Sequence, residues 1–180
     1  MFFQEPMHRE HFNSDELKLV NRAISVSEEL VSDHYKLSES QWLRNRFDVK
    51  TGAQLSPEER AASDVFAQVI RYRGAPFPDA GAPREFDLYM ICLQDQSILR
   101  EVETNAEVPL YPFLLYLFVH ELVHIVRFGR FIQSFTMPDT KRDLEENIVH
   151  ERTREILAST QLTGVEKIIS QRWAIRHCTQ

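Results

Sequence analysis

The sequence FVHELVHIV occupies residues 118–126, at the end of an apolar stretch that begins at Val108. The uncharged run 108–119, VPLYPFLLYLFV, has 12 residues, whereas a membrane-spanning helix needs roughly 20. We therefore expect no membrane span. The run instead predicts a buried helix that begins at Leu110 or Pro112 and ends near Phe128.

Two histidines within this helix have the spacing of metal ligands. His120 and His124 are four residues apart, so their side chains lie on one helix face. Two neutral imidazoles in this arrangement can bind one tetrahedral Zn²⁺. Glu121 lies about 100° round the helix, where its carboxylate can reach a water on the ion without becoming a ligand. One helical turn therefore supplies two ligands and a general base.

The apolar surroundings of the motif favour a metal site. Phe113, Tyr116 and Leu117 share the helix face of the two histidines, which indicates that the motif belongs to a buried helix. Buried imidazoles and carboxylates are costly unless they are paired or bind a metal. The simpler alternative is a pair of hydrogen-bonded core histidines.

The stretch 118–126 resembles the active-site helix of the zincin metallopeptidases, and the resemblance covers about 110–153. It implies a zincin-like α+β fold, here mostly helical, with a small sheet and an active-site helix near 112–128. It also implies Zn²⁺ as cofactor, a peptide or protein substrate, and a third ligand further along the chain. The extended metzincin motif is absent, because no glycine and third histidine follow His124 at its spacing. The resemblance is thus to the gluzincins, in which a second helix donates a glutamate.

Two side chains of the expected second helix are candidates for the third ligand. Glu146 lies 22 residues after His124, close to the gluzincin spacing, and shares a helix face with His150. If Glu146 binds the metal, His150 either supports one of the ligands by a hydrogen bond or donates to the developing oxyanion of the substrate. If His150 binds instead, the site has three histidine ligands. We prefer Glu146 and keep His150 as the alternative.

Other residues near the motif have both a functional and a structural interpretation. Arg127 could pair with Glu146 or Asp143, or bind a substrate carboxylate. Equally, it could be a solvated arginine that complements the dipole at the helix end. Tyr111 and Tyr116 could donate to an oxyanion, although each is more often a core residue.

The remaining sequence predicts a single domain with an arm at 1–12, a helical N-terminal part at 13–73 and the metal-site core at 86–159. Capping residues and apolar periodicity predict further helices at 13–35, 56–73, 141–159 and 163–175. A strand is expected at 86–93, followed by a turn at 94–96 and a second strand at 97–102. The mixed stretch 42–55 has room for one short strand, and the proline-rich stretch 74–85 predicts a loop.

Composition argues against several other classes of protein. The 180 residues, 43% hydrophobic and 27% charged, are ordinary for a soluble globular domain. The net charge of −6 gives no general basic field to attract nucleic acid. Residues 1–10 lack the apolar core of a secretory signal, and Cys92 and Cys178 form no CxxC pair. We therefore expect a cytoplasmic protein with two free thiols, and no oligomeric state is indicated.

Two other functions compete with that of a hydrolase. A ferritin-like di-iron bundle needs two ExxH pairs. Glu121 and His124 form one pair, but Asn147 stands where a second pair would need a glutamate before His150. Alternatively, a metal-binding protein with a regulatory or interaction role could keep a zincin fold without peptidase activity. Glu121 favours the enzyme, since a purely structural metal site needs no general base.

Overall fold

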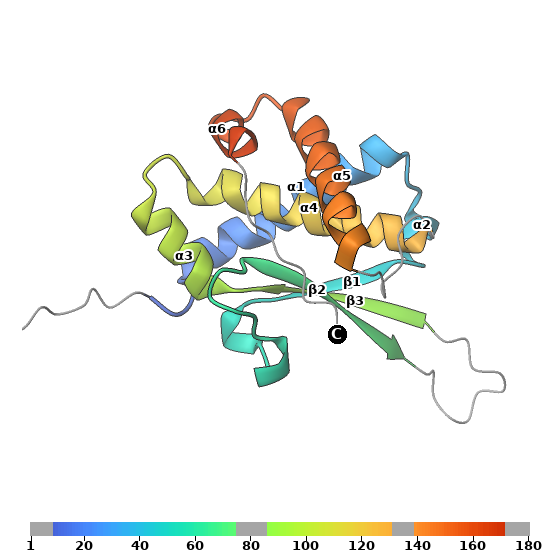
Figure 1. The fold of residues 1–180 in the computed structure, drawn as a ribbon, viewed down its shortest axis with the longest axis horizontal. Coiled ribbons are helices and arrows are strands. Elements are labelled where there is room, and N and C mark those ends of the chain that lie inside the picture. Colours follow the sequence, from blue (N-terminus) through green and yellow to red (C-terminus); the bar gives the residue numbers. More distant parts are fainter. Residues whose placement is uncertain (1–8, 75–85, 131–138, 172–180) are drawn as a thin grey trace, which may run out of the picture.

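The computed structural model describes residues 9–74, 86–130 and 139–171, and it shows a mostly helical α+β fold. Most of the helices lie on one side of a small three-stranded sheet (Figure 1). This confirms the predicted class at the level of α+β. The helices are α1 (Ser14–Tyr35), α2 (Glu39–Trp42), α3 (Asp95–Thr104), α4 (Leu110–Gly129), α5 (Asp139–Ala158) and α6 (Val165–Ser170). The strands and short 3₁₀ turns are β1 (Arg46–Lys50), η1 (Gly52–Gln54), η2 (Pro57–Glu59), β2 (Ala67–Gly74) and β3 (Phe86–Leu93).

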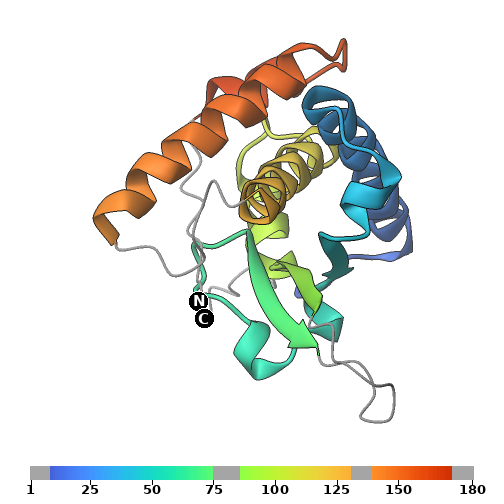
Figure 2. The same ribbon diagram turned by 90° about the vertical axis from the view of Figure 1, so that its right-hand side faces the viewer.

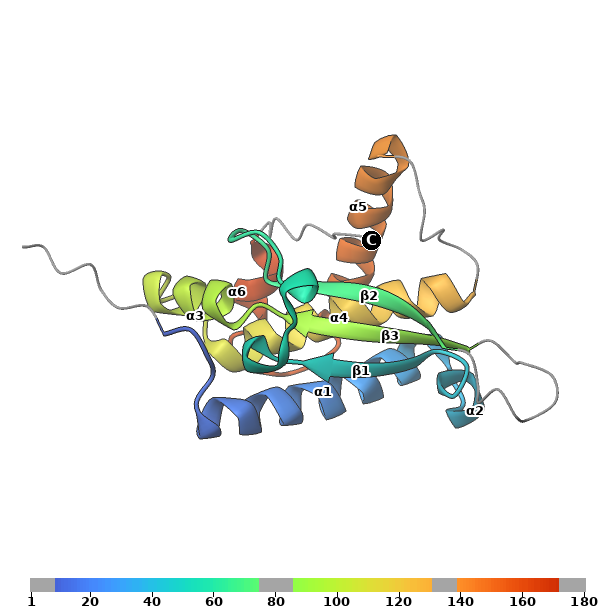
Figure 3. The ribbon, with the colours of Figure 1, turned by 90° about the horizontal axis from the view of Figure 1, so that it is seen from below.

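The sheet has the order β1-β3-β2, with β1 parallel and β2 antiparallel to the central strand (Figure 3). Successive residues of β3 point to opposite faces. Tyr89 and Ile91 join the main core, whereas Met90 and Cys92 belong to a smaller apolar cluster that includes Leu55. The segment of η1 and η2, which carries Leu55, lies under the face opposite the helices (Figure 1). Burial of β3 on both sides explains its nearly continuous apolar sequence.

α4 is the central helix of the fold. Every residue from Pro112 to Val126 is buried, and the helix packs against α1, α5, α6 and β2. Figure 2 shows α4 nearly end-on, between α1 and α5 and above the sheet. Among the described residues, α4 is the one helix long and apolar enough to cross a membrane, and 83% of its most apolar window is buried inside the fold. Burial on all sides explains why apolar residues surround the whole helix.

Several predicted elements are confirmed. α1 follows a capping box in which the Asn13 side chain accepts hydrogen bonds from the amides of Asp15 and Glu16. The Glu16 carboxylate in turn accepts a bond from the Asn13 amide at 2.8 Å. α4, α5 and β3 lie within two residues of their predicted bounds, and the short strand expected in 42–55 is β1.

The predicted helix at 56–73 is wrong. Ser56 and Glu59 do form a capping box, but the helix ends after the single turn η2, and 67–74 form β2. The helical interpretation placed Val69 and Ile70 on one face, whereas they lie in the two different apolar clusters of the sheet. Pairing with β3 outweighs the local helix signal, because it supplies backbone hydrogen bonds and an apolar environment on each side. The part 13–73 is therefore not wholly helical.

The predicted turn at 94–96 and strand at 97–102 are also wrong, because α3 begins at Asp95. Ile98 and Leu99 are buried, and Val102 packs against the same core. This is the spacing of one helix face, not the alternation of a strand.

The last predicted helix is shorter than expected. α6 ends at Ser170, and its N-cap is Gly164 in place of the expected Thr163. Most of the predicted arm and of the loop at 74–85 lies outside the described residues. Cys178 also lies outside them, whereas Cys92 is a buried free thiol.

Candidate metal centre

Three side chains from α4 and α5 meet in one cluster. His120 and His124 on α4 have side-chain exposures of 0% and 2%, and Glu146 on α5 has 17%. The Nε2 atoms of the two histidines are 3.2 Å apart. Glu146 places Oε2 3.4 Å from His120 Nε2 and Oε1 3.3 Å from His124 Nε2. In the part of the chain that the structure describes, these residues form the one group that could hold a metal ion.

The spacing of these atoms fits a tetrahedral ion. Two atoms bound at about 2.0–2.1 Å to one tetrahedral Zn²⁺ lie about 3.3–3.4 Å apart. The Nε2 atoms of the two histidines, 3.2 Å apart, are close to this value, and a different oxygen of Glu146 lies 3.3–3.4 Å from each of them. Two histidines and one glutamate are also a donor set that catalytic zinc sites use.

The packing of two helices explains why these residues meet. His120 and His124 are one turn apart on α4, and their ring centroids are 4.9 Å apart. α5 packs against α4 (Figure 2) and carries Glu146 in its second turn. The spacing of the two histidines is therefore set within α4, whereas the position of the third ligand candidate, Glu146, depends on how α5 packs against α4.

No family model, curated protein or solved structure matches this chain. The chemistry of the site is therefore inferred from its own residues and their surroundings. Besides the three ligand candidates, Glu121 and His150 are the two residues whose surroundings are informative about this chemistry.

Glu121 follows the first ligand candidate on α4, and its side chain is buried. Burial raises the pKa of Glu121 well above its usual value, and the negative charge of Glu146 adds to the effect. A carboxylate whose pKa is raised accepts a proton near neutral pH more readily than a surface glutamate does. Glu121 therefore remains the candidate general base of the site.

His150 lies beside the cluster and is not one of its three members. Its Nδ1 is 2.6 Å from the Tyr116 hydroxyl, and its ring centroid is 4.6 Å from that of His120. Burial lowers the pKa of His150 and raises the pKa of Tyr116, which favours the neutral form of both. A phenol that donates to Nδ1 leaves the imidazole proton on Nε2. The fold therefore assembles the cluster with Glu146, and it places His150 beside the cluster in contact with Tyr116.

Arg127 has a partner that the sequence analysis did not select. Its Nη2 donates to Glu145 Oε2 at 3.0 Å, and its Nε donates to Glu145 Oε1. The expected partners were Glu146 and Asp143. The spacing along the chain could not identify Glu145, because it does not show which of two adjacent glutamates faces α4. Tyr111 lies under the guanidinium of Arg22 in α1, so it is at the contact of α1 with α4.

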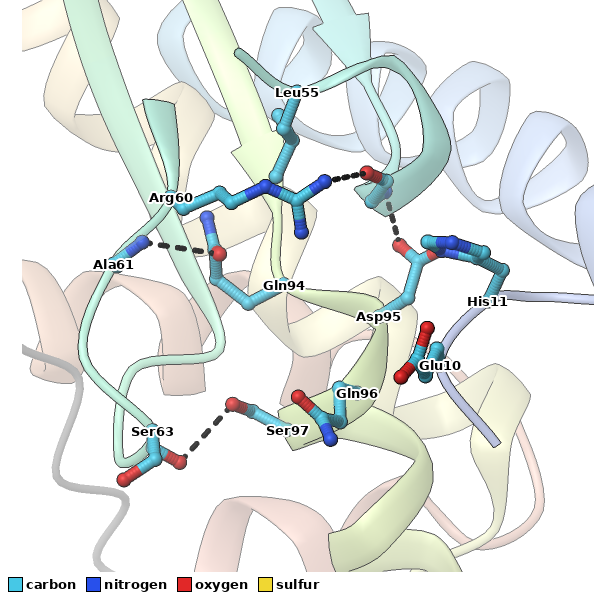
Figure 4. A pocket seen from close by; sticks show the side chains of 11 residues that line it. Glu10, His11, Leu55, Arg60, Ala61, Ser63, Gln94, Asp95, Gln96 and Ser97 are labelled. Atoms are coloured by element: carbon cyan, nitrogen blue, oxygen red, sulfur yellow. Dashed lines mark hydrogen bonds and ion pairs between the residues drawn. The ribbon is translucent and has the colours of Figure 1, made fainter. Parts of the chain in front are cut away.

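A cavity of about 300 Å³ lies at the start of α3, and none of the three ligand candidates lines it (Figure 4). Asp95 accepts hydrogen bonds there from the amides of Gly52 at 2.7 Å and Phe12 at 3.2 Å. Gln94 accepts another from the amide of Ala61 at 3.1 Å. These bonds join the N-terminal segment and the η1–η2 segment to the end of β3. We therefore assign these residues, which the sequence analysis did not single out, a structural role.

Proposed function

We propose that this protein is a zinc-dependent hydrolase of the zincin type, with a peptide or protein as substrate. The observation that supports this most directly is the cluster of His120, His124 and Glu146, in which the two Nε2 atoms are 3.2 Å apart and each has a Glu146 oxygen within 3.4 Å. A buried glutamate, Glu121, adjoins the first of them in sequence. Three protein ligands leave one position of a tetrahedral ion for water or substrate, as in catalytic zinc sites.

In this proposal, different residues around the site have different roles in hydrolysis. When bound, Zn²⁺ lowers the pKa of a coordinated water towards 7 and polarises the carbonyl of the substrate. Glu121 accepts the proton of the attacking water and can pass it to the departing amine. His150, oriented by the Tyr116 hydroxyl at 2.6 Å, donates from Nε2 to the negative charge that develops on the carbonyl oxygen.

The first test is metal content. The purified protein is expected to hold about one Zn²⁺ per chain, and His120→Ala or His124→Ala should remove it. His34→Ala is the matched control, because His34 is an exposed histidine of α1 and should have no effect. Elemental analysis after dialysis measures all four proteins. Full retention of metal in both ligand variants would contradict the zinc site.

The second test separates an enzyme from a metal-binding protein without activity. Glu121→Gln preserves size but removes the proton acceptor, so Zn²⁺ content should persist while hydrolysis falls by about 10²–10⁴-fold. A broad peptide library supplies the substrate. A wild-type protein that holds zinc and cleaves no peptide of the library would support the regulatory or interaction role instead. Equal cleavage by wild type and Glu121→Gln would show that Glu121 is not the base.

A further inference from the structure

A buried ion pair joins α4 to α5 next to the metal centre. Arg127 donates from Nε and Nη2 to the two different oxygens of Glu145, the second bond being 3.0 Å long. The side chains are only 11% and 8% exposed. A two-point contact between a planar guanidinium and a carboxylate fixes the orientation of the two groups as well as their distance.

The carboxylate of this pair is the immediate neighbour of the candidate ligand. Adjacent residues of an α-helix point about 100° apart, so α5 can direct only one of Glu145 and Glu146 at the two histidines. Arg127 lies three residues after His124, and therefore on the side of α4 that carries the metal ligands. By holding Glu145, Arg127 leaves Glu146 directed at the two Nε2 atoms.

We propose that the Arg127–Glu145 pair is a positioning device that selects Glu146 as the third ligand, because it fixes the rotation of α5 about its own axis. This inference rests on the proposed metal site. Arg127 and Glu145 touch neither metal nor substrate in this role. They act through Glu146.

A pair that only stabilises the fold would behave differently from a pair that positions a ligand. Replacing a buried ion pair by apolar side chains of similar size is often neutral or stabilising, whereas removing one partner leaves a buried charge and is destabilising. A double apolar variant should therefore recover folding stability in either case. The Zn²⁺ affinity of the double variant should recover along with its stability only if the pair does not position Glu146.

The experiment measures Zn²⁺ affinity by competition with a chromophoric chelator, alongside unfolding in urea. Arg127→Met and Glu145→Met should each lower stability and weaken Zn²⁺ binding by about 10–100-fold. The double variant should recover stability and keep the weakened binding. Arg127→Lys retains the charge without the two-point contact and should give an intermediate affinity. Glu155→Gln, which breaks the exposed pair of Glu155 with Arg152, is the matched control with wild-type affinity.

A double variant that binds Zn²⁺ as tightly as wild type would overturn the inference. The imidazole nitrogen-15 resonances of the metal-free protein give an independent readout, because Glu146 lies against Nε2 of both His120 and His124. Both resonances should shift in the double variant and stay unchanged in Glu155→Gln. If wild type binds no metal but these resonances shift, only the proposed function fails. Unchanged resonances would contradict the positioning role itself.

Discussion

Glu146 and His150 lie one turn apart on α5, yet they have different neighbours. Glu146 lies against both candidate histidine ligands, whereas His150 contacts the Tyr116 hydroxyl through Nδ1. A carboxylate ligand offsets part of the positive charge of the ion, and a neutral imidazole does not. The identity of the third ligand therefore affects both the affinity of the site and the acidity of a water in it.

Substitutions at these two positions should have separable effects. Glu146→Gln should weaken Zn²⁺ binding, because an amide is a poorer zinc ligand than a carboxylate. The loss of affinity should exceed the about 10–100-fold that is expected when only a residue supporting a ligand is removed. His150→Ala should keep the metal and lower kcat by about 10²–10³-fold, as loss of an oxyanion donor does. Chelator competition and peptide cleavage measure the two effects. Loss of metal in His150→Ala with retention in Glu146→Gln would identify a three-histidine site.

Glu59, which is not part of the candidate metal centre, makes stability depend on pH. Burial acts to raise the pKa of Glu59, but bonds from Lys50, the Ser56 amide and Tyr72 lower it to about 2. An unfolded glutamate has a pKa of about 4.3, so these bonds stabilise the fold above about pH 5 and lose their effect as the pH falls towards 2. Glu59→Gln should cost about 1–3 kcal/mol at pH 7 and flatten this acid dependence.

Urea unfolding at a series of pH values measures this dependence. Glu29→Gln, at an exposed position of α1, is the control and should unfold with the pH profile of wild type. An unchanged acid slope in Glu59→Gln would show that another carboxylate causes the loss of stability.

The site residues differ in how far sequence alone could identify them. His120, Glu121 and His124 lie within about one turn, so helical geometry suffices to relate them. The choice of Glu146 depends on the rotation of α5, and the partner Glu145 fixes that rotation only once α5 packs against α4. The spacing of 22 residues from His124 favoured Glu146, but it could not show that Arg127 would hold the neighbouring Glu145.

At the scale of elements, the same distinction separates the correct predictions from the wrong ones. α1 has its own capping box, and α4 has a long apolar sequence, so both could be predicted locally. β2 could not, because it follows a helix-capping signal at Ser56 and forms a strand only by pairing with β3. α3 was missed because 94–96 was interpreted as a turn, although Ile98, Leu99 and Val102 have the spacing of a helix face.

The junction between α5 and α6 depends on one glycine. Gly164 has φ +90°, and a Cβ at this position would lie 3.3 Å from Pro112 Cγ and 3.4 Å from Pro109 Cγ. A left-handed backbone disfavours other residues, so Gly164→Ala should cost about 1–2 kcal/mol in urea unfolding. The exposed neighbour variant Thr163→Ala should stay within about 0.5 kcal/mol of wild type. Equal effects of the two substitutions would argue against backbone strain as the cause.

At the scale of the whole molecule, the sheet separates two apolar layers of unequal size. The main core lies between the sheet and the helices, and the smaller layer contains Leu55, Ile70, Met90 and Cys92. Cys92 is fully buried in the central strand, so its thiol is accessible only when the two layers come apart. Its chemical reactivity therefore reports on the opening of the smaller layer.

The thiol of Cys92 should be unreactive in the native protein. Burial, reinforced by the charge of Glu59, raises the pKa of Cys92 to about 12, and the thiol is the unreactive form. In a Cys178→Ser background, Ellman's reagent should label Cys92 only as fast as the protein unfolds, and at once in denaturant. Rapid labelling under native conditions would show that the smaller layer opens without global unfolding.

The burial of α4 from Pro112 to Val126 also predicts how related chains would diverge. Each position from Pro112 to Val126 is restricted either by packing or by the chemistry of the site, so few substitutions there are neutral. The outer faces of α1 and α5 carry no such restriction. Over long evolutionary separation, ancestry would therefore persist in a block of about four helical turns while the surrounding sequence drifts beyond recognition. A search pattern restricted to that block, with the pair Arg127 and Glu145 added at variable spacing, should detect more distant relatives than the full-length sequence.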